Sequence, residues 1–149
     1  MSNRPIIFEG AMVRAIRAGV KRQTRRVGAR YERWEPGDLL WVRESFWVQP
    51  ELWAESHGPQ PIHYAADVQD PAEIEDYVKK PSIHMPRWAS RLTLRLTANR
   101  REHIFDIALD DVAAEGFRTL IDFLMAWAAL HPGLSPQTMV SALSFEVVQ

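Results

Sequence analysis

The chain has 149 residues, the length of about one domain, and its 18 basic and 19 acidic residues give a formal charge of −1. Hydrophobic residues make up 46% and charged residues 25%, as is typical of a packed water-soluble protein. The absence of cysteine excludes disulfides, thiolate metal sites and a cysteine nucleophile. Every apolar run is shorter than the roughly 20 residues of a membrane span, and the first residues lack a signal-peptide pattern. We therefore expect one cytoplasmic domain that does not bind membranes.

The charges are segregated along the chain although their sum is near zero. Residues 4–43 carry ten basic and four acidic residues, residues 44–86 carry two and eight, and residues 87–149 carry six and seven. Fifteen of the basic residues are arginine, whose planar guanidinium suits phosphates and base edges. A basic first third indicates a site for an anionic ligand. It is equally consistent with an acidic middle segment that folds back and neutralises it.

The first part of the sequence has well-marked elements. In chain order it predicts a strand, a helix, a basic extended segment and a second strand, at residues 5–8, 9–18, 21–27 and 39–43. Gly19 is well placed to end the helix in the left-handed conformation, and Pro36-Gly37-Asp38 is a turn signal.

The middle of the sequence is less regular. Residues 49–60 contain two prolines and a glycine, which predicts a loop within an insertion at about residues 49–80. A short strand at 62–65, one helical turn at 72–77 and a long loop at 80–90 follow.

The last third predicts a strand, two helices and a final strand, at residues 92–97, 106–115, 118–130 and 143–148. Leu120, Phe123, Leu124 and Trp127 form the apolar face of the second helix. Short strands mixed with a few helices indicate an α+β fold with a small mixed sheet or barrel.

The most basic segment is the first candidate site. Residues 21–26 hold four cations, and an extended chain would place Arg22, Thr24 and Arg26 on one face and Lys21, Gln23 and Arg25 on the other. Crowding by arginines would lower the pKa of Lys21 and favour its action as a base. The alternative is a solvated basic strand on the surface.

Two further segments have residues suited to nucleic acid. In the strand at 39–43, Trp41 and Arg43 share a face and form a stacking surface for a base, and Glu44 follows. The alternative places Trp41 in the core and makes Arg43 and Glu44 a structural ion pair.

The loop at 79–91 holds His84, Arg87 and Trp88 between prolines. Such a loop is costly to order without a role, so we expect His84 and Arg87 to hold a phosphate or carbonyl and Trp88 to stack. The alternative is that Met85 and Trp88 pack against the fold while the polar residues are exposed.

Glu115 lies at the end of a predicted helix, where a carboxylate is unfavourable for the helix dipole. That position is a mild indication of function. The five histidines are scattered, with none of the spacings typical of zinc sites, so we expect no metal and no cofactor.

Taken together, four segments resemble the ASCH domain family, a branch of the PUA-like fold, and are most similar to its phage- and prophage-borne members. The resemblance rests on residues 5–26, on Pro36-Gly37-Asp38 through Trp41-Val42-Arg43-Glu44, on residues 81–91 and on Ala113-Ala114-Glu115-Gly116. It implies a small mixed β-barrel with flanking helices and a cleft suited to RNA or nucleosides.

A more distant resemblance joins the chain to the amidohydrolases of this family, which deacetylate N4-acetylcytidine with a Lys, a Thr three residues later and a Glu. Matching this pattern gives Lys21 as base, Thr24 as nucleophile and Glu115 as an acid or orienting group. Position 22 is Arg where those enzymes usually have Thr, and the chain is longer than they are, mainly at 49–88.

These observations lead to a hypothesis with open alternatives. The chain binds RNA or a modified nucleoside, through Arg22, Arg25, Arg26, Trp41, Arg43, Glu44, His84, Arg87 and Trp88 beside the three catalytic candidates, and deacylates N4-acetylcytidine. Alternatives are RNA binding without catalysis, a single-strand ribonuclease, and a phage accessory protein that binds a protein partner. The sequence leaves the oligomeric state open between a monomer and a weak dimer.

Overall fold

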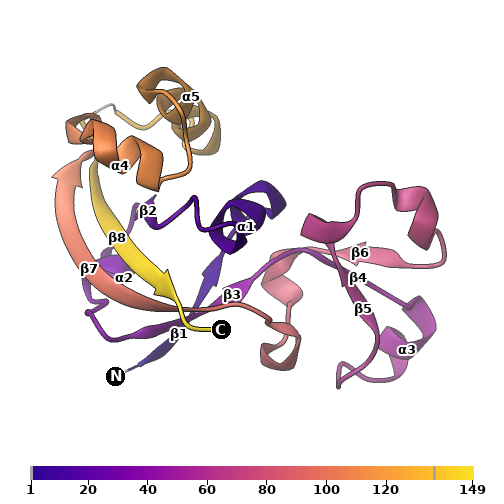
Figure 1. Ribbon diagram of the computed structural model, residues 1–149. Helices are drawn as coiled ribbons and strands as arrows, with labels where there is room; N and C mark the ends of the chain where they lie inside the picture. The colour runs from indigo at the N-terminus through magenta and orange to yellow at the C-terminus, as the bar shows by residue number, and fades with distance from the viewer. Residues whose placement is uncertain (1, 136) are drawn as a thin grey trace.

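A five-stranded mixed sheet forms the larger of two lobes in the computed structural model, which describes residues 2–135 and 137–149 (Figure 1). Its strands, in spatial order, are β1 (Asn3–Ile7), β3 (Leu39–Arg43), β7 (Thr93–His103), β8 (Met139–Val147) and β2 (Gln23–Arg26). The β1–β3 pair is parallel, and the other pairs are antiparallel. The predicted α+β class is confirmed.

A three-stranded antiparallel sheet forms the second lobe, drawn in magenta and pink in Figure 1. Its order is β5 (Ile62–Tyr64), β4 (Phe46–Val48) and β6 (Val78–Lys80). This sheet has a core of its own, in which Phe46, Val48 and Met85 are buried. The predicted insertion at 49–80 falls within this lobe.

The larger sheet is curved but is not the closed barrel that we expected. Its edge strands β1 and β2 do not pair with one another among the described residues. Instead, Nη2 of Arg26 on β2 donates a hydrogen bond of 2.7 Å to the carbonyl of Ile7 on β1. A side chain thus spans the gap that a backbone ladder would close.

Helices cover the ends of the larger sheet and one edge of the smaller. They are α1 (Gly10–Arg17), α2 (Ala29–Glu32), α3 (Pro50–Glu55), α4 (Leu109–Ala114) and α5 (Leu120–Leu130). In the described part of the chain, no helix is both long and apolar enough to cross a bilayer. Helix α1 ends just before Gly19, whose φ is +79°. The prediction that Gly19 ends this helix in the left-handed conformation is therefore confirmed.

The prediction of a loop at 49–60 is wrong in its first half, where α3 forms. Pro50 occupies the first turn of this helix, a position at which its missing N–H costs nothing. The strand predicted at 92–97 is longer than expected, because β7 continues to His103 and pairs with β8 through a register shift between Leu96 and Ala98.

Alternation of side chains along β3 explains how the larger core is built. Leu40 and Val42 are completely buried, whereas Trp41 and Arg43 on the opposite face are half-buried. A second cluster lies under α5, whose Phe123 and Trp127 pack with Val112 of α4. This cluster confirms the predicted apolar face for Phe123, Leu124 and Trp127, whereas the prediction is wrong for Leu120, which is exposed at the start of the helix.

An ion-pair group joins the two lobes. Arg91, which precedes β7, binds both carboxylate oxygens of Glu44 at 3.0 and 3.1 Å and also reaches Asp67 at 2.6 Å. Its guanidinium lies 3.9 Å from the centre of the Tyr64 ring in the smaller sheet. Because Glu44 is only 1% exposed, this carboxylate is a structural partner of Arg91.

We expect Glu44→Ala to lower the free energy of unfolding by about 3 kcal/mol, because it leaves the Arg91 guanidinium without its buried partner. Urea unfolding followed by circular dichroism measures the loss. Glu146→Ala is the matched control, since it removes the exposed ion pair with Arg95 and is expected to cost less than about 0.5 kcal/mol. Equal losses in the two variants would contradict the structural role of Glu44.

Candidate functional site

The chain between α1 and β2 is fixed by backbone hydrogen bonds on two sides. The amide of Lys21 donates to the carbonyl of Ala15 in α1 at 3.1 Å, and the amide of Arg22 donates to Ala114 in α4 at 2.6 Å. These contacts bring the basic segment against the end of α4, where Glu115 follows.

Lys21 and Glu115 form a buried ion pair. The Lys21 ammonium donates to the Glu115 carboxylate oxygen Oε1 at 3.0 Å and to its backbone carbonyl at 2.9 Å. Both residues are only 3% exposed. Burial lowers the pKa of Lys21, the charge and hydrogen bond of Glu115 partly oppose this, and Arg26 and Arg25 lower it further.

The backbone conformation at Gly116, and not a lack of space, favours glycine directly after Glu115. Its φ of +100° is a conformation that favours glycine, and a Cβ here would lie 3.5 Å from the Cβ of Lys21. The glycine therefore lets the chain turn away directly after Glu115.

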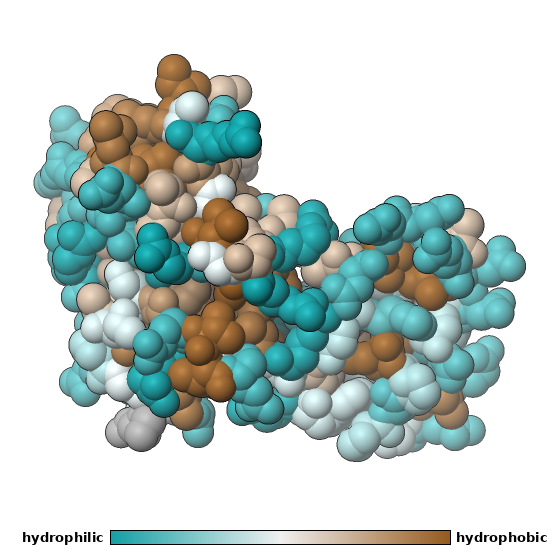
Figure 2. All heavy atoms as spheres, in the orientation of Figure 1, coloured by the Kyte–Doolittle hydropathy of each residue, from teal (hydrophilic) through white to brown (hydrophobic). Residues whose placement is uncertain are grey.

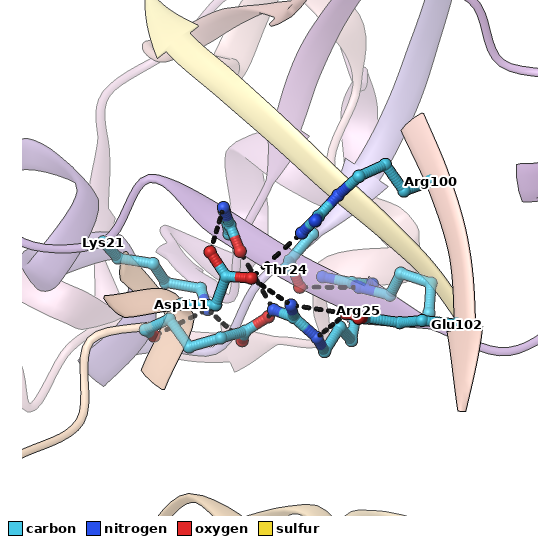
Figure 3. A network of polar contacts seen from close by, with 9 residues as sticks. Lys21, Thr24, Arg25, Arg100, Glu102 and Asp111 are labelled. Carbon is cyan, nitrogen blue, oxygen red and sulfur yellow. Dashed lines mark hydrogen bonds and ion pairs between the residues drawn. The ribbon is translucent and has the colours of Figure 1, made fainter. Parts of the chain in front are cut away.

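Arg25 is the centre of a network of acids (Figure 3). Its side chain is 0% exposed and binds Glu115 Oε2 at 2.9 Å, Glu102 Oε1 at 2.6 Å and Asp111 Oδ2 at 3.2 Å. Burial alone would raise the pKa of Asp111, but hydrogen bonds from Arg100 and Gln23 and the charge of Arg25 lower it. Arg25 is therefore paired within the protein.

Thr24 and Arg26 lie together on the other face of β2. Arg26 Nε donates to the Thr24 hydroxyl at 3.1 Å, and its guanidinium lies 4.8 Å from the centre of the Phe8 ring. Arg25 binds Gln23 in the same way on the opposite face, at 3.0 Å. The predicted alternation of side chains along this segment is confirmed, and Arg22 is exposed.

A cavity of about 380 Å³ opens beside these residues. Its polar lining comes from Lys21, Thr24, Arg25, Arg26 and Glu115, together with Glu9. The rest is largely apolar and comes from β1, α1, and α5 with the segment before it: Ile7, Phe8, Met12, Phe117, Phe123, Ala126, Trp127, Leu130 and His131. Figure 2 shows the apolar surface gathered over α4 and α5. The three catalytic candidates thus line one cavity.

The second group of predicted site residues lies apart from this lining. Trp41, Arg43, His84, Arg87 and Trp88 are not among the residues that line the cavity. Arg43 and Arg87 both lie over the Trp41 ring, at 5.4 and 5.3 Å from its centre. The sequence predicts one cleft that holds all of these residues. In the structure they lie on two neighbouring surfaces, one in the cavity and one around Trp41.

Three of the predicted binding residues, Arg43, Trp88 and Glu44, have partners within the protein, and Arg43 donates to the carbonyls of Met85 and Ile83. The Trp88 indole donates to the carbonyl of His57 at 2.7 Å, and the ring packs against the smaller core. Glu44 binds Arg91, as described above. His84 is exposed at the edge of its loop.

The sequence analysis missed the acids around Arg25 and most of the apolar wall. Glu102 and Asp111 lie 77 and 86 residues from Arg25, so no local pattern connects them. The spacing of Phe123 and Trp127 predicts an apolar helix face, but no pattern in the sequence indicates that this face also lines a cavity.

Solved structures share this arrangement of elements. An ASCH domain from Lactobacillus crispatus JV V101 superposes with a TM-score of 0.57 at 14% identity, covering 99% of this chain and 80% of that one. This protein has the fold of an ASCH domain. The hypothetical protein PH0355 gives a TM-score of 0.58 at 12% identity, covering 99% of this chain and 100% of the other.

A third structure, protein EF3133 from Enterococcus faecalis V583, has a TM-score of 0.53 at 13% identity, over 98% of this chain and 76% of the other. No protein-family model and no curated protein matches the chain. The likeness to known ASCH structures is thus one of fold.

We expect Arg25→Met to lower the free energy of unfolding by about 3–5 kcal/mol, because it leaves three carboxylates around a side chain without charge. Denaturant unfolding gives the value. The control is Arg22→Met, the same change at the exposed neighbouring position, which is expected to stay within about 0.5 kcal/mol. A mild effect of Arg25→Met would show that the network contributes little.

A second prediction concerns the pH dependence of stability. Because the pKa of Lys21 is lower in the folded protein than its ordinary value of 10.5, the unfolded chain binds more protons between these two values. The free energy of unfolding should therefore gain a contribution that rises with pH across that window. Urea unfolding at a series of pH values, compared with Lys21→Met, isolates the contribution. Identical pH profiles would contradict the lowered pKa.

Proposed function

We propose that this protein binds RNA or a modified nucleoside in the cavity beside β2 and hydrolyses the amide of an N4-acylated cytidine. The observation that carries the proposal is the meeting of Lys21, Thr24 and Glu115 at one cavity, from segments more than 90 residues apart. A base, a hydroxyl nucleophile and an orienting carboxylate are the groups that acyl transfer needs.

The environment of Lys21 suits a base. Burial lowers its pKa, which raises the share of neutral amine at neutral pH. Both carboxylate oxygens of Glu115 accept hydrogen bonds from cations, Oε1 from Lys21 and Oε2 from Arg25. We therefore assign Glu115 the orienting role and not that of an acid.

Thr24 is placed to act as the nucleophile. Its hydroxyl oxygen already accepts a hydrogen bond from Arg26, a contact that would stabilise negative charge on this oxygen. In the proposed reaction, Thr24 Oγ1 bonds to the amide carbon as its proton passes to the Lys21 amine. The C–N bond then breaks, cytidine leaves with that proton, and water hydrolyses the threonyl ester to release the acid.

The apolar wall of the cavity accounts for the rest of the ligand. Phe117, Phe123 and Trp127 offer aromatic surface opposite the polar residues. A flat base or an acyl group packs well on such a wall, because stacking tolerates any π-face.

Binding of RNA without catalysis is the second candidate. The hydrogen bonds of the Lys21 ammonium in the described structure go to Glu115, and none joins it to the Thr24 hydroxyl. Catalysis therefore requires the two side chains to approach when substrate binds, whereas binding alone requires no change.

We extend the proposal to the fold superfamily of the domain. The open five-stranded sheet, bridged by Arg26 where a barrel would close, fits a PUA-like barrel opened between β1 and β2. We propose that residues 1–149 form one such domain, with the smaller lobe as its insertion.

Incubation of the purified protein with N4-acetylcytidine tests the enzymatic proposal. We expect release of cytidine and acetate, followed by liquid chromatography, and a loss of at least about 100-fold in Thr24→Val, which keeps the shape of the side chain. Lys21→Ala should lose the activity as well.

Arg33→Ala is the matched control, since it alters an exposed cation that does not line the cavity. The absence of turnover above the Thr24→Val level would rule out hydrolysis of this substrate. Binding of the nucleoside without turnover would favour the second candidate.

A further inference from the structure

Two arginines from different elements converge on one half-buried indole. Arg43 on β3 and Arg87 in the turn after β6 lie 5.4 and 5.3 Å from the centre of the Trp41 ring. Trp41 and Arg43 are half-buried, and Arg87 is exposed. We call these three residues the Trp41 surface.

The two guanidiniums of this surface have no carboxylate partner among the ion pairs of residues 2–135 and 137–149. Arg43 is held by the carbonyls of Met85 and Ile83. Elsewhere Arg25 and Arg91 each bind two or more acids. Two like charges gathered on one ring without a counter-charge are a ready site for an anion.

The cavity, in contrast, holds carboxylates among its cations. Lys21 and Arg25 are both paired with Glu115, and Arg26 donates to Ile7 and Thr24. A phosphate entering the cavity would have to displace these contacts. Arg26 is the one cation of this lining that has no place in the ion pairs of the described residues, and a phosphate beside it would also meet the carboxylates of Glu9 and Glu115. The cavity is therefore better suited to an uncharged group than to a phosphate.

The Trp41 surface lies directly beside the cavity. Arg43 is the register partner of Ile7 in the parallel β1–β3 pair, and adjacent strands are about 4.8 Å apart. Ile7 lines the cavity, and its carbonyl accepts the hydrogen bond from Arg26. Ile7 therefore separates Arg43 from the cavity.

We propose that the Trp41 surface binds the phosphate backbone of a single RNA strand, one of whose bases enters the cavity. This inference rests on the proposed function and specifies its substrate as an RNA strand in preference to a free nucleoside. Guanidinium forks bind phosphate with two parallel hydrogen bonds, and a single strand can turn one base away from its neighbours.

The test measures fluorescence anisotropy of a labelled single-stranded RNA of about ten nucleotides that contains one N4-acetylcytidine. Arg87→Gln is the informative variant, because Arg87 is exposed and its side-chain contact described here is the one with Trp41, so we expect the fold to tolerate the change. Arg95→Gln removes the same charge from an exposed position on β7 and is the matched control.

We expect Arg87→Gln to weaken RNA affinity about tenfold and to lower the salt dependence of binding by about 0.7 in log–log slope, the value for one phosphate contact on a single strand. Arg95→Gln should stay within about twofold of the unaltered protein. Equal weakening in both variants would overturn the inference, as would unchanged affinity in Arg87→Gln or no RNA binding by the unaltered protein.

The nucleoside assay separates this inference from the proposed function. If the protein hydrolyses N4-acetylcytidine and Arg87→Gln leaves RNA affinity unchanged, the hydrolase proposal stands and the proposed role of the Trp41 surface in RNA binding is wrong. If Arg87→Gln alone loses RNA affinity and the unaltered protein does not hydrolyse N4-acetylcytidine, the role of the Trp41 surface is supported and the hydrolase proposal is wrong.

Discussion

The carboxylate of Glu115, held between Lys21 and Arg25, is the contact on which the rest of the site depends. Strand β2 lies at the edge of the larger sheet and pairs with β8 alone. Its attachment to α4 comes from these two cations, from the Arg22 amide and from the Gln23 side chain, and not from a second hydrogen-bonded strand. An edge fixed by side chains leaves its other side open, and the cavity occupies that opening.

The ion pairs also decide between the two interpretations of the segregated charge. The acidic middle segment does not neutralise the basic first third, because the described ion pairs join these parts through Arg17 and Asp67 alone. The last third supplies the acids for Lys21 and Arg25, although its own net charge is close to zero. Net charge by segment therefore indicated where cations gather but not what they contact.

Elements with a strong local pattern were predictable, and long-range contacts were not. The strand at 39–43 was predicted to the residue, because apolar and polar side chains alternate along it. Helix α3 was missed because Pro50 was interpreted as a breaker, although proline at a first helical turn is favourable. The resemblance indicated Lys21 and Glu115 together, but the buried state of Arg25 depends on acids far along the chain.

Long-range contacts also determine where the smaller lobe lies. The lobe has its own buried core and is joined to the larger sheet through Arg91, so it does not close over β2. Arg43, at the end of β3, is held by carbonyls of the loop that returns from this lobe. The insertion thus fixes a cation without supplying it a carboxylate. Arg43 thus lies beside the cavity without a carboxylate partner among the ion pairs of the described residues, whereas Lys21 and Arg25 inside it share the carboxylate of Glu115.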